Sequence, residues 1–199
     1  MRHDVIVPRD VPEQPWSNGT GSRRVLLHTS HWVVSLAEIR EARTFSPFPG
    51  RDRFLIPLDG AELTLRIGAV EHRVNHDRPL RFRGEDEVIS SPTDRCVRVL
   101  NVITTRDTAT VGVTVRRGGS PAATPANATV LLDGWARVTR RLVPSGTVFL
   151  GGSTPVFSDD AVVADLHLRH HPTRANPHRH GRGVASAGGG LRHSLATMP

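Results

Sequence analysis

The sequence contains no lysine, no tyrosine, a single cysteine and no long apolar run. A membrane-spanning helix needs about 20 apolar residues in succession, so we expect no membrane span. The first sixteen residues, MRHDVIVPRDVPEQPW, hold acids and prolines where a signal peptide would need an apolar core. The lone Cys96 excludes an internal disulfide framework and agrees with a reducing compartment. We therefore expect a cytoplasmic protein.

Because lysine is missing, all 26 basic residues are arginines. The formal net charge of +7 and a pI near 11.4 would suit a nucleic-acid partner. However, residues 1–171 hold 22 arginines against 19 acids, and the remaining excess lies in the acid-free residues 172–199. The sequence has no recognition-helix pattern, and arginine without lysine is typical of a GC-rich genome. The charge pattern therefore argues against a nucleic-acid partner.

Apolar residues alternate with polar ones along most of the chain, which is the period of a β-strand. In AELTLRI, for example, Leu63, Leu65 and Ile67 share one face, and Gly68-Ala69 then turns into VEHRV. The same pattern predicts strands over residues 31–39, 96–104, 109–115, 128–133, 135–142, 147–152 and 161–168. No segment has the period and the caps of an amphipathic helix. The sequence predicts an all-β fold, either a sandwich or a barrel.

A linker rich in Gly, Pro and Ala at residues 116–128 interrupts the strand pattern. LIPLDGAELTL and RPLRFRGEDEV before it are echoed by VLLDGWARV and LVPSGTVFLGG after it. We interpret this echo as a weak internal repeat, with halves at residues 1–117 and 118–171 of one compact domain. Residues 172–199 are poor in apolar side chains and rich in Gly, Pro and His, so we expect a disordered basic tail.

Four motifs follow one another in a recognisable order: PWSNGTGSRR at 15–24, FSPFPGRDR at 45–53, LDG at 58–60 and CVRVLNVITTR at 96–106. Together they resemble the HutD/Ves family of small bacterial proteins over roughly residues 10–170. The resemblance implies a double cupin (bicupin) β-barrel, which agrees with the strand pattern. The positions that match the family motifs are Asn18, Gly19, Gly21, Phe45, Ser46, Phe48, Pro49, Gly50, Arg53, Asn101 and Arg106. The positions that depart from them are Ser17, Thr20, Arg23, Val25, Val99 and Leu100.

The resemblance also implies a function. Members of the family lie with histidine-degradation genes or respond to stress, and no catalytic activity is established for them. Those in histidine degradation are suggested to be regulatory proteins that bind an intermediate such as formiminoglutamate or urocanate. Because Ser17, Thr20 and Val99 depart from the motifs, we expect a ligand different from that of the histidine-pathway members.

We expect the ligand to be a small carboxylate at the mouth of the N-terminal barrel. An inward-facing Arg53 would hold a carboxylate through two parallel hydrogen bonds, with Arg106 as a further cation. Asn101 shares the inner face of its strand with Val97 and Val99, and its donor and acceptor suit an amide or formimino group. The stiff FSPFPG turn would hold Arg53 in place before the ligand arrives. The expected ligand-binding residues are Asn18, Ser46, Phe48, Arg53, Asn101 and Arg106.

The polar residues of this site also have structural interpretations, which the sequence leaves open. Arg53 would instead form an ion pair with Asp52, Asp59 or a nearby loop acid, and Arg106 carries the same ambiguity. Asn101 would instead fix the backbone of a neighbouring loop. Both interpretations satisfy the side chain without a ligand, so only its surroundings in the fold separate them.

The aromatic residues and the first arginines have structural interpretations too. Phe45 and Phe48 suit core or lid packing better than ligand stacking. Trp16 is expected to close one end of the barrel. Arg23 and Arg24 are expected to be solvated at a strand edge.

The histidines of the core do not follow the spacing of a metal-dependent cupin, which has two histidines one residue apart, then a carboxylate, then a third histidine. They are His28, His31, His72, His76 and His167. No Ser/His/Asp arrangement is recognisable, and Cys96 is typical of a buried apolar thiol. The sequence therefore favours a binding module without metal, cofactor or catalytic residue. The alternative is a metal-independent isomerase or epimerase acting on a small acid or sugar, and a homodimer stays open.

Overall fold

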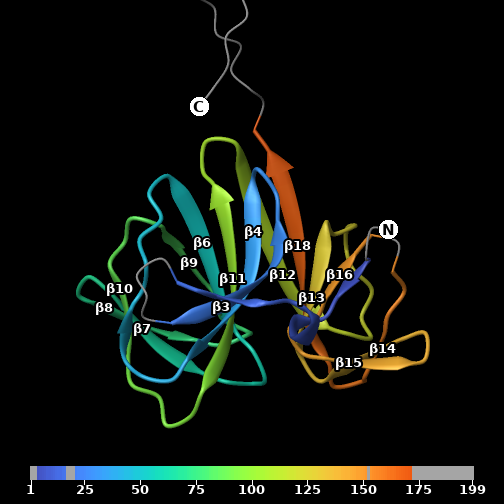
Figure 1. Ribbon diagram of the computed structural model, residues 1–199. Coiled ribbons are helices and arrows are strands. Elements are labelled where there is room, and N and C mark those ends of the chain that lie inside the picture. The colour runs from blue at the N-terminus through green and yellow to red at the C-terminus, as the bar shows by residue number, and fades with distance from the viewer. Residues whose placement is uncertain (1–3, 17–20, 152, 172–199) are drawn as a thin grey trace, which may run out of the picture.

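The computed structural model describes residues 4–16, 21–151 and 153–171. Within these ranges the chain forms eighteen strands and one short 3₁₀ turn, η1 (Pro8–Asp10). The expectation of an all-β fold is therefore confirmed (Figure 1). No helix in these ranges is long and apolar enough to cross a membrane. The tail predicted at residues 172–199 lies outside the described residues.

Two large antiparallel sheets form the centre of the molecule (Figure 1). The six-stranded sheet runs in the order β2 (Glu13–Pro15), β3 (Ser22–His28), β4 (Trp32–Ile39), β11 (Val97–Thr105), β6 (Arg51–Pro57) and β9 (Leu80–Arg83). The five-stranded sheet runs in the order β1 (Val5–Ile6), β16 (Val148–Leu150), β13 (Ala128–Asp133), β18 (Val162–His170) and β12 (Ala109–Arg117). We call the part built on the six-stranded sheet the N-terminal half and the part built on the five-stranded sheet the C-terminal half.

A smaller sheet covers the far side of each large one. The N-terminal half has β5 (Arg43–Thr44), β10 (Val88–Ser90), β7 (Leu63–Ile67) and β8 (Val70–Val74), in that order. The C-terminal half has β15 (Arg141–Pro144), β14 (Trp135–Val138) and β17 (Val156–Phe157). Each half is thus a pair of sheets that encloses its own core.

The alternation of side chains distributes the apolar residues over three cores. On β4, Val34 and Leu36 face the C-terminal half and belong to the largest core cluster, which both halves share. Ala37 and Ile39 face the interior of the N-terminal half. A third cluster, which includes Leu131, fills the C-terminal half. A strand that is buried on both faces has apolar residues at nearly every position. This explains the nearly continuous apolar runs VVSLAEI in β4 and VLNVIT in β11.

The strand pairing of the two halves repeats. In the N-terminal half β6 pairs with β9 and β11, while β7 pairs with β8 and β10. In the C-terminal half β13 pairs with β16 and β18, while β14 pairs with β15 and β17. The two Leu-Asp-Gly segments occupy the same corner, and their glycines, Gly60 and Gly134, have φ of 62° and 78°. The repeat suspected in the sequence therefore corresponds to two copies of one strand arrangement.

The division of the chain between the halves differs from the predicted boundary at residue 117. Strand β12 precedes the linker, yet all nine of its residues pair with β18 in the C-terminal half. Strand β1, near the N-terminus, pairs with β16 in the same sheet. Hydrogen bonds between distant segments decide to which sheet a strand belongs. The change in composition at the linker therefore did not show where one half ends and the other begins.

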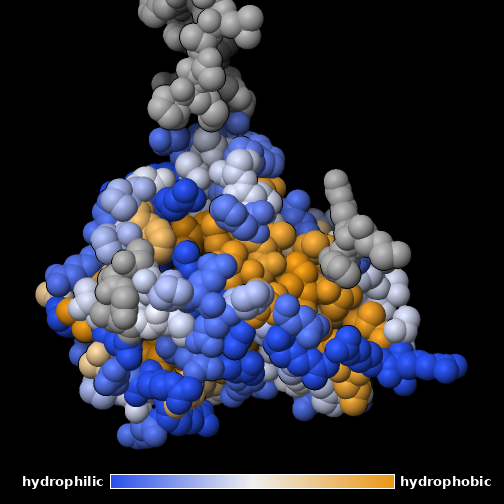
Figure 2. Space-filling model, in the orientation of Figure 1, coloured by the Kyte–Doolittle hydropathy of each residue, from blue (hydrophilic) through white to orange (hydrophobic). Residues whose placement is uncertain are grey.

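The shared core reaches the surface along one side of the molecule. Figure 2 shows an apolar area on the face where β13, β16 and β18 lie in Figure 1. Val113, Val115, Leu150 and Leu168 are only partly buried where they pack against this core. Hydrophilic residues border much of this area in that view.

Candidate functional site

A cavity of about 40 Å³ opens at one end of the N-terminal half. Because one water needs about 10–15 Å³ in this measure, the space suits a few waters or one small molecule. Its lining comprises Trp16, Arg23, Ser35, Ala37, Ile39, Phe45, Ser46, Phe48, Arg53, Val99, Asn101 and Ile103. Most of these side chains come from the inner faces of β3, β4, β11 and β6. Trp16 follows β2, and the remaining three come from the turn before β6.

Strand register brings the polar lining residues together. Asn101 of β11 pairs with Ser35 on β4, and two residues further on Ile103 pairs with Arg53 on β6. Partners in register point to the same side of a sheet, so all four side chains face the interior. Asn101 therefore lies on the inner face, as the alternation of its strand predicted.

Arg53 is buried in this cavity without an acid. Its side chain is 6% exposed, Nη2 donates to Asn101 Oδ1 over 2.9 Å, and Nη1 donates to the Ser46 carbonyl over 3.2 Å. The acids considered as partners are used elsewhere, since Asp52 pairs with Arg81 and Arg106, and Asp59 pairs with Arg98. Within the described ranges Arg53 thus forms no ion pair.

Three phenylalanine rings surround the Arg53 guanidinium. Its central carbon lies 5.3 Å from the ring centroid of Phe45, 5.1 Å from that of Phe48 and 4.9 Å from that of Phe82. Such cation–π contacts offset part of the desolvation of a buried cation. Burial, and next the charge of Arg23, lower the pKa of Arg53 to about 10. The guanidinium is therefore still charged at neutral pH.

Several hydrogen-bond donors at the cavity have no partner among the described residues. They are Arg53 Nε, Arg23 Nε and the Ser46 hydroxyl, all of them buried. Since Arg53 can only donate, the oxygen of Asn101 must face it, and the Asn101 amide nitrogen is left as a further donor. Asn101 thus offers a ligand only its N–H donor, because its oxygen already accepts from Arg53. The sequence had suggested that both the donor and the acceptor would be free for the ligand. A cavity so rich in donors suits an anion.

Arg23 was missed as a site residue, and the expectation that it is solvated at a strand edge is wrong. Strand β3 lies between β2 and β4, and Arg23 pairs with Ala37 on the inner face. Arg24 takes the opposite face, where it donates to the Val11 carbonyl and forms an ion pair with Glu13. The Asn-Gly pair at residues 18–19 of the sequence was a usable signal, because such a pair favours a hairpin between the strands before and after it. Strand β2 does pair with β3, so β3 is not the edge strand of its sheet.

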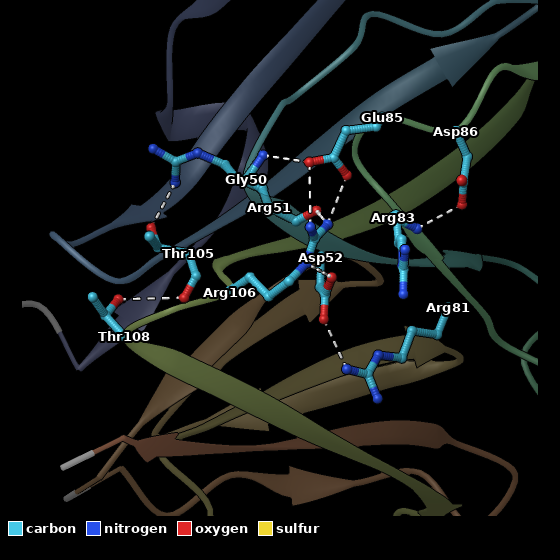
Figure 3. A network of polar contacts seen from close by, with 10 residues as sticks. All are labelled: Gly50, Arg51, Asp52, Arg81, Arg83, Glu85, Asp86, Thr105, Arg106 and Thr108. Atoms are coloured by element: carbon cyan, nitrogen blue, oxygen red, sulfur yellow. Dashed lines mark hydrogen bonds and ion pairs between the residues drawn. The ribbon is translucent and has the colours of Figure 1, made fainter. Parts of the chain in front are cut away.

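Arg106 does not line the cavity but joins a polar network on the outside of the six-stranded sheet (Figure 3). Its Nε lies 2.8 Å from Asp52 Oδ1, and its Nη2 lies 2.7 Å from Glu85 Oε2. Glu85 also accepts a hydrogen bond of 2.6 Å from the Gly50 amide. The hydrogen bond from Arg106, followed by that from Gly50, lowers the pKa of Glu85 to about 2, and Glu85 in turn raises the pKa of Arg106.

This network fixes the FSPFPG turn over Arg53. The Phe48 amide donates to the Gly84 carbonyl, and the Gly84 amide donates to the Arg51 carbonyl, both over 2.7 Å. A Cβ at Gly84 would lie 1.9 Å from the Phe48 carbonyl oxygen, so only glycine permits this approach. The rigid aromatic turn thus holds Phe48 against the Arg53 guanidinium.

Comparison with known proteins agrees with these features. The sequence profile of HutD matches residues 8–171. This chain belongs to the HutD family. Protein Ves of Citrobacter koseri is 31% identical over 107 residues, which cover 50% of this chain and 56% of that protein. The chain thus spans about half the length of the curated relatives it matches.

Solved structures of the family share the fold. HutD from Pseudomonas fluorescens SBW25 has a TM-score of 0.65 at 20% identity, covering 83% of this chain and 98% of that one. A conserved protein of unknown function from Pseudomonas aeruginosa PAO1, PA5104, has a TM-score of 0.67 at 22% identity, covering 84% and 98%. The chain therefore has the fold of the HutD structure, as the resemblance of its motifs to the HutD/Ves family implied.

The predicted site residues of this HutD family member fall into three groups. Ser46, Phe48, Arg53 and Asn101 meet at the cavity, whereas Arg106 lies in the network outside it. Asn18 is outside the described residues. Trp16 lines the cavity and packs edge-on against Phe45, with ring centroids 6.3 Å apart.

The C-terminal half of the HutD chain has an inward arginine as well, but an acid accompanies it. Asn101 pairs with Leu55, and the corresponding pair in the repeat is Asp165 with Thr129. Asp165 is buried, binds Arg116 through Nε over 2.6 Å and accepts a hydrogen bond from Thr129 over 2.7 Å. The basic group of this half is neutralised within the chain, whereas that of the N-terminal half is not.

Metal-ligating side chains do not gather in the part of this HutD chain that the structure describes. No three His, Cys, Asp or Glu residues come close enough to hold an ion there. The cavity lining itself contains none of these four residue types. Its chemistry is therefore that of cationic and neutral donors framed by aromatic and aliphatic side chains.

Proposed function

We propose that this HutD family member binds a small carboxylate in the cavity of its N-terminal half. The observation that carries the proposal is Arg53, a buried cation without an acid in the described ranges. Burying an uncompensated charge is unfavourable by several kcal/mol, and an anionic ligand removes that penalty. The free donors of Ser46 and Asn101 lie beside Arg53, where they would reach the oxygens of a bound carboxylate.

The same cavity supports a binding role over an enzymatic one. General acid–base catalysis needs a group that titrates near the working pH, and the part of the lining that the structure describes holds no histidine, carboxylate or thiol. An arginine side chain can attract and orient an anion, but it is a poor proton donor or acceptor in catalysis. A binding and regulatory protein without a metal is the function that these residues support best.

Relatives of the chain suggest which carboxylates to examine first. A protein of Pseudomonas putida that is 28% identical over 112 residues is described as lying in the hutC 3′ region. This description supports testing intermediates of histidine degradation, such as urocanate and N-acyl glutamates. Asn101 has its oxygen occupied by Arg53, so it favours ligand oxygens over an amide or formimino N–H at that point.

The test is a thermal-shift screen of urocanate, N-acyl glutamates, dicarboxylates and simple monocarboxylates, followed by calorimetric titration of any compound that stabilises the protein. Arg53→Met keeps the stem among the aromatic rings and removes the charge, so we expect affinity to fall about ten- to a hundredfold. Arg66→Met is the matched control, because Arg66 lies on β7 and bonds only the Gly68 carbonyl. Unchanged affinity in Arg53→Met would refute the proposed site.

A further inference from the structure

A second guanidinium enters the cavity opposite Arg53, and its partners in the described ranges include no acid. Arg23 is half-buried, its Nε is buried without a hydrogen-bond partner, and it lines the same space. We propose that the ligand is a dianion whose two carboxylates bind at separate points, one at Arg53 and the other at Arg23. This inference rests on the proposed function and adds the class of ligand.

The backbones of the two arginines are well separated on the sheet, and their side chains reach the cavity from different sides. Strands β4 and β11 lie between β3 and β6, so the two backbones are about 14 Å apart across the sheet. Arg23 is level with Ala37 and Val99, whereas Arg53 is level with Ile103, about 14 Å further along the strand. The side chains thus reach the cavity from opposite corners, which suits two anionic groups on one short chain better than a single compact oxyanion.

The space between these corners is polar at its centre. Ser35 and Asn101 pair with each other on neighbouring strands and line the middle of the cavity. Asn101 Oδ1 already accepts from Arg53, which leaves the amide nitrogen free to donate towards the ligand. A compact dicarboxylate would therefore place one carboxylate near Arg53 and Ser46, and its second towards Arg23.

The charge of the cavity leads to the same conclusion. The charge of Arg23 contributes, after burial, to the lowered pKa of Arg53, so the two cations repel each other. Among the residues that the structure describes, no acid lines the cavity to relieve this repulsion. A monoanion would leave one cation uncompensated, whereas a dianion would neutralise both. The contrast with Asp165, which neutralises Arg116 in the other half, shows how this fold pairs such a cation within the chain.

The experiment compares glutarate with its monomethyl ester, which has the same carbon chain and one charge fewer. By calorimetric titration we expect the native protein to bind glutarate at least tenfold more tightly than the ester. Arg23→Gln should remove this preference while changing affinity for the ester less than twofold. Arg24→Gln is the matched control, since the neighbouring Arg24 faces away from the cavity, and it should keep the preference.

Three outcomes would overturn the inference. If the ester binds as tightly as glutarate but Arg53→Met abolishes both, the ligand is a monoanion and the proposed function stands. If inorganic phosphate binds more tightly than glutarate, a single dianionic oxyanion replaces the two carboxylates. If neither compound binds the native protein, the two-point dianion is ruled out, and the thermal-shift screen alone then decides the proposed function. Arg23→Lys, which keeps the charge, should retain part of the preference and separates a lost charge from lost folding.

Discussion

Ser46 is buried at the cavity, where its backbone carbonyl has a hydrogen-bond partner but its side-chain hydroxyl has none among the described residues. The carbonyl accepts from Arg53. A buried polar group without a partner lowers the stability of the fold by about 1–3 kcal/mol. Such a group is retained where it gains a partner in the functional state, and the nearby Arg53 indicates that this partner is an anion.

Ser46→Ala should consequently change stability and binding in opposite directions. Without ligand we expect the free energy of unfolding to rise by about 1 kcal/mol, because the unsatisfied hydroxyl is removed. Affinity for the best carboxylate should fall about tenfold, the equivalent of one lost charge-assisted hydrogen bond. Urea denaturation with and without ligand measures both quantities.

Ser90→Ala provides the comparison for that experiment. Ser90 is also fully buried, but its hydroxyl oxygen accepts a hydrogen bond of 3.0 Å from the Arg43 amide. Its removal should therefore lower stability by about 1–3 kcal/mol and leave affinity unchanged. If both alanine variants lose stability equally, the Ser46 hydroxyl has a structural role and our interpretation of it is wrong.

At the scale of the element, the FSPFPG turn depends on contacts from outside itself. Its prolines restrict the backbone, but its position over Arg53 comes from the Gly84 hydrogen bonds and from the Glu85 carboxylate on the Gly50 amide. Arg106 completes this arrangement by binding both Glu85 and Asp52 (Figure 3). Arg106 thus positions the turn, which is a different task from the ligand contact expected from the sequence.

The Glu85 contacts should make the turn sensitive to acid. The pKa of Glu85 in the fold, about 2, is below its ordinary value of 4.5, so the unfolded chain takes up the proton more readily. The stabilisation is therefore complete above about pH 4.5 and is lost as the pH falls towards 2. We expect amide exchange at Phe48, Gly50 and Gly84, corrected for its intrinsic pH dependence, to accelerate through this window.

Glu85→Gln should accelerate the same three amides already at pH 7, because the neutral side chain no longer holds Arg106 as an ion pair. It should also weaken carboxylate binding a few-fold, since Phe48 is less firmly held. Asp86→Asn is the control, because Asp86 accepts only from the Arg83 amide and lies away from Gly50. Equal protection in the native protein and in Glu85→Gln would contradict the positioning role.

At the scale of the whole molecule, the two halves are joined by a common core rather than by a linker. The largest apolar cluster lies between the two large sheets, and β4, β11 and β6 contribute to it as well as β13 and β18. Polar contacts extend this junction, since Arg98 binds Asp59 in its own half and Ser145 in the other. The Asp59 amide also donates to the Leu132 carbonyl over 3.0 Å.

A shared core predicts one cooperative unfolding transition for both halves. Leu100 on β11 is fully buried in this core, and Leu100→Ala should lower the free energy of unfolding by about 2–5 kcal/mol. Differential scanning calorimetry should give equal calorimetric and van't Hoff enthalpies for the native protein and the variant. Leu142→Ala, at an exposed position of β15, is the control with little expected effect. Two resolved transitions would show that the halves unfold independently.

Features that depend on local alternation could be predicted from the sequence alone. A period of two gives β-strands wherever it occurs, because successive side chains point to opposite faces of a strand. This period therefore predicted the all-β fold and the inward direction of Asn101. It also predicted the repeat, in which one strand of each half ends in Asp-Gly. The motif around Phe45, Phe48 and Arg53 also indicated the family, since it is long enough to be specific.

Which groups meet in the fold could not be predicted from the sequence, because the partners lie on strands that are far apart in the chain. Arg23 and Arg106 are both motif-flanking arginines, yet pairing of β3 with β4 turns Arg23 inward, while Glu85 and Asp52 hold Arg106 outside. The acceptor of Asn101 is taken by Arg53, 48 residues away in sequence. Charge, spacing and alternation are local properties, whereas the absence of an acid beside Arg53 in the described fold is a property of the packed sheets.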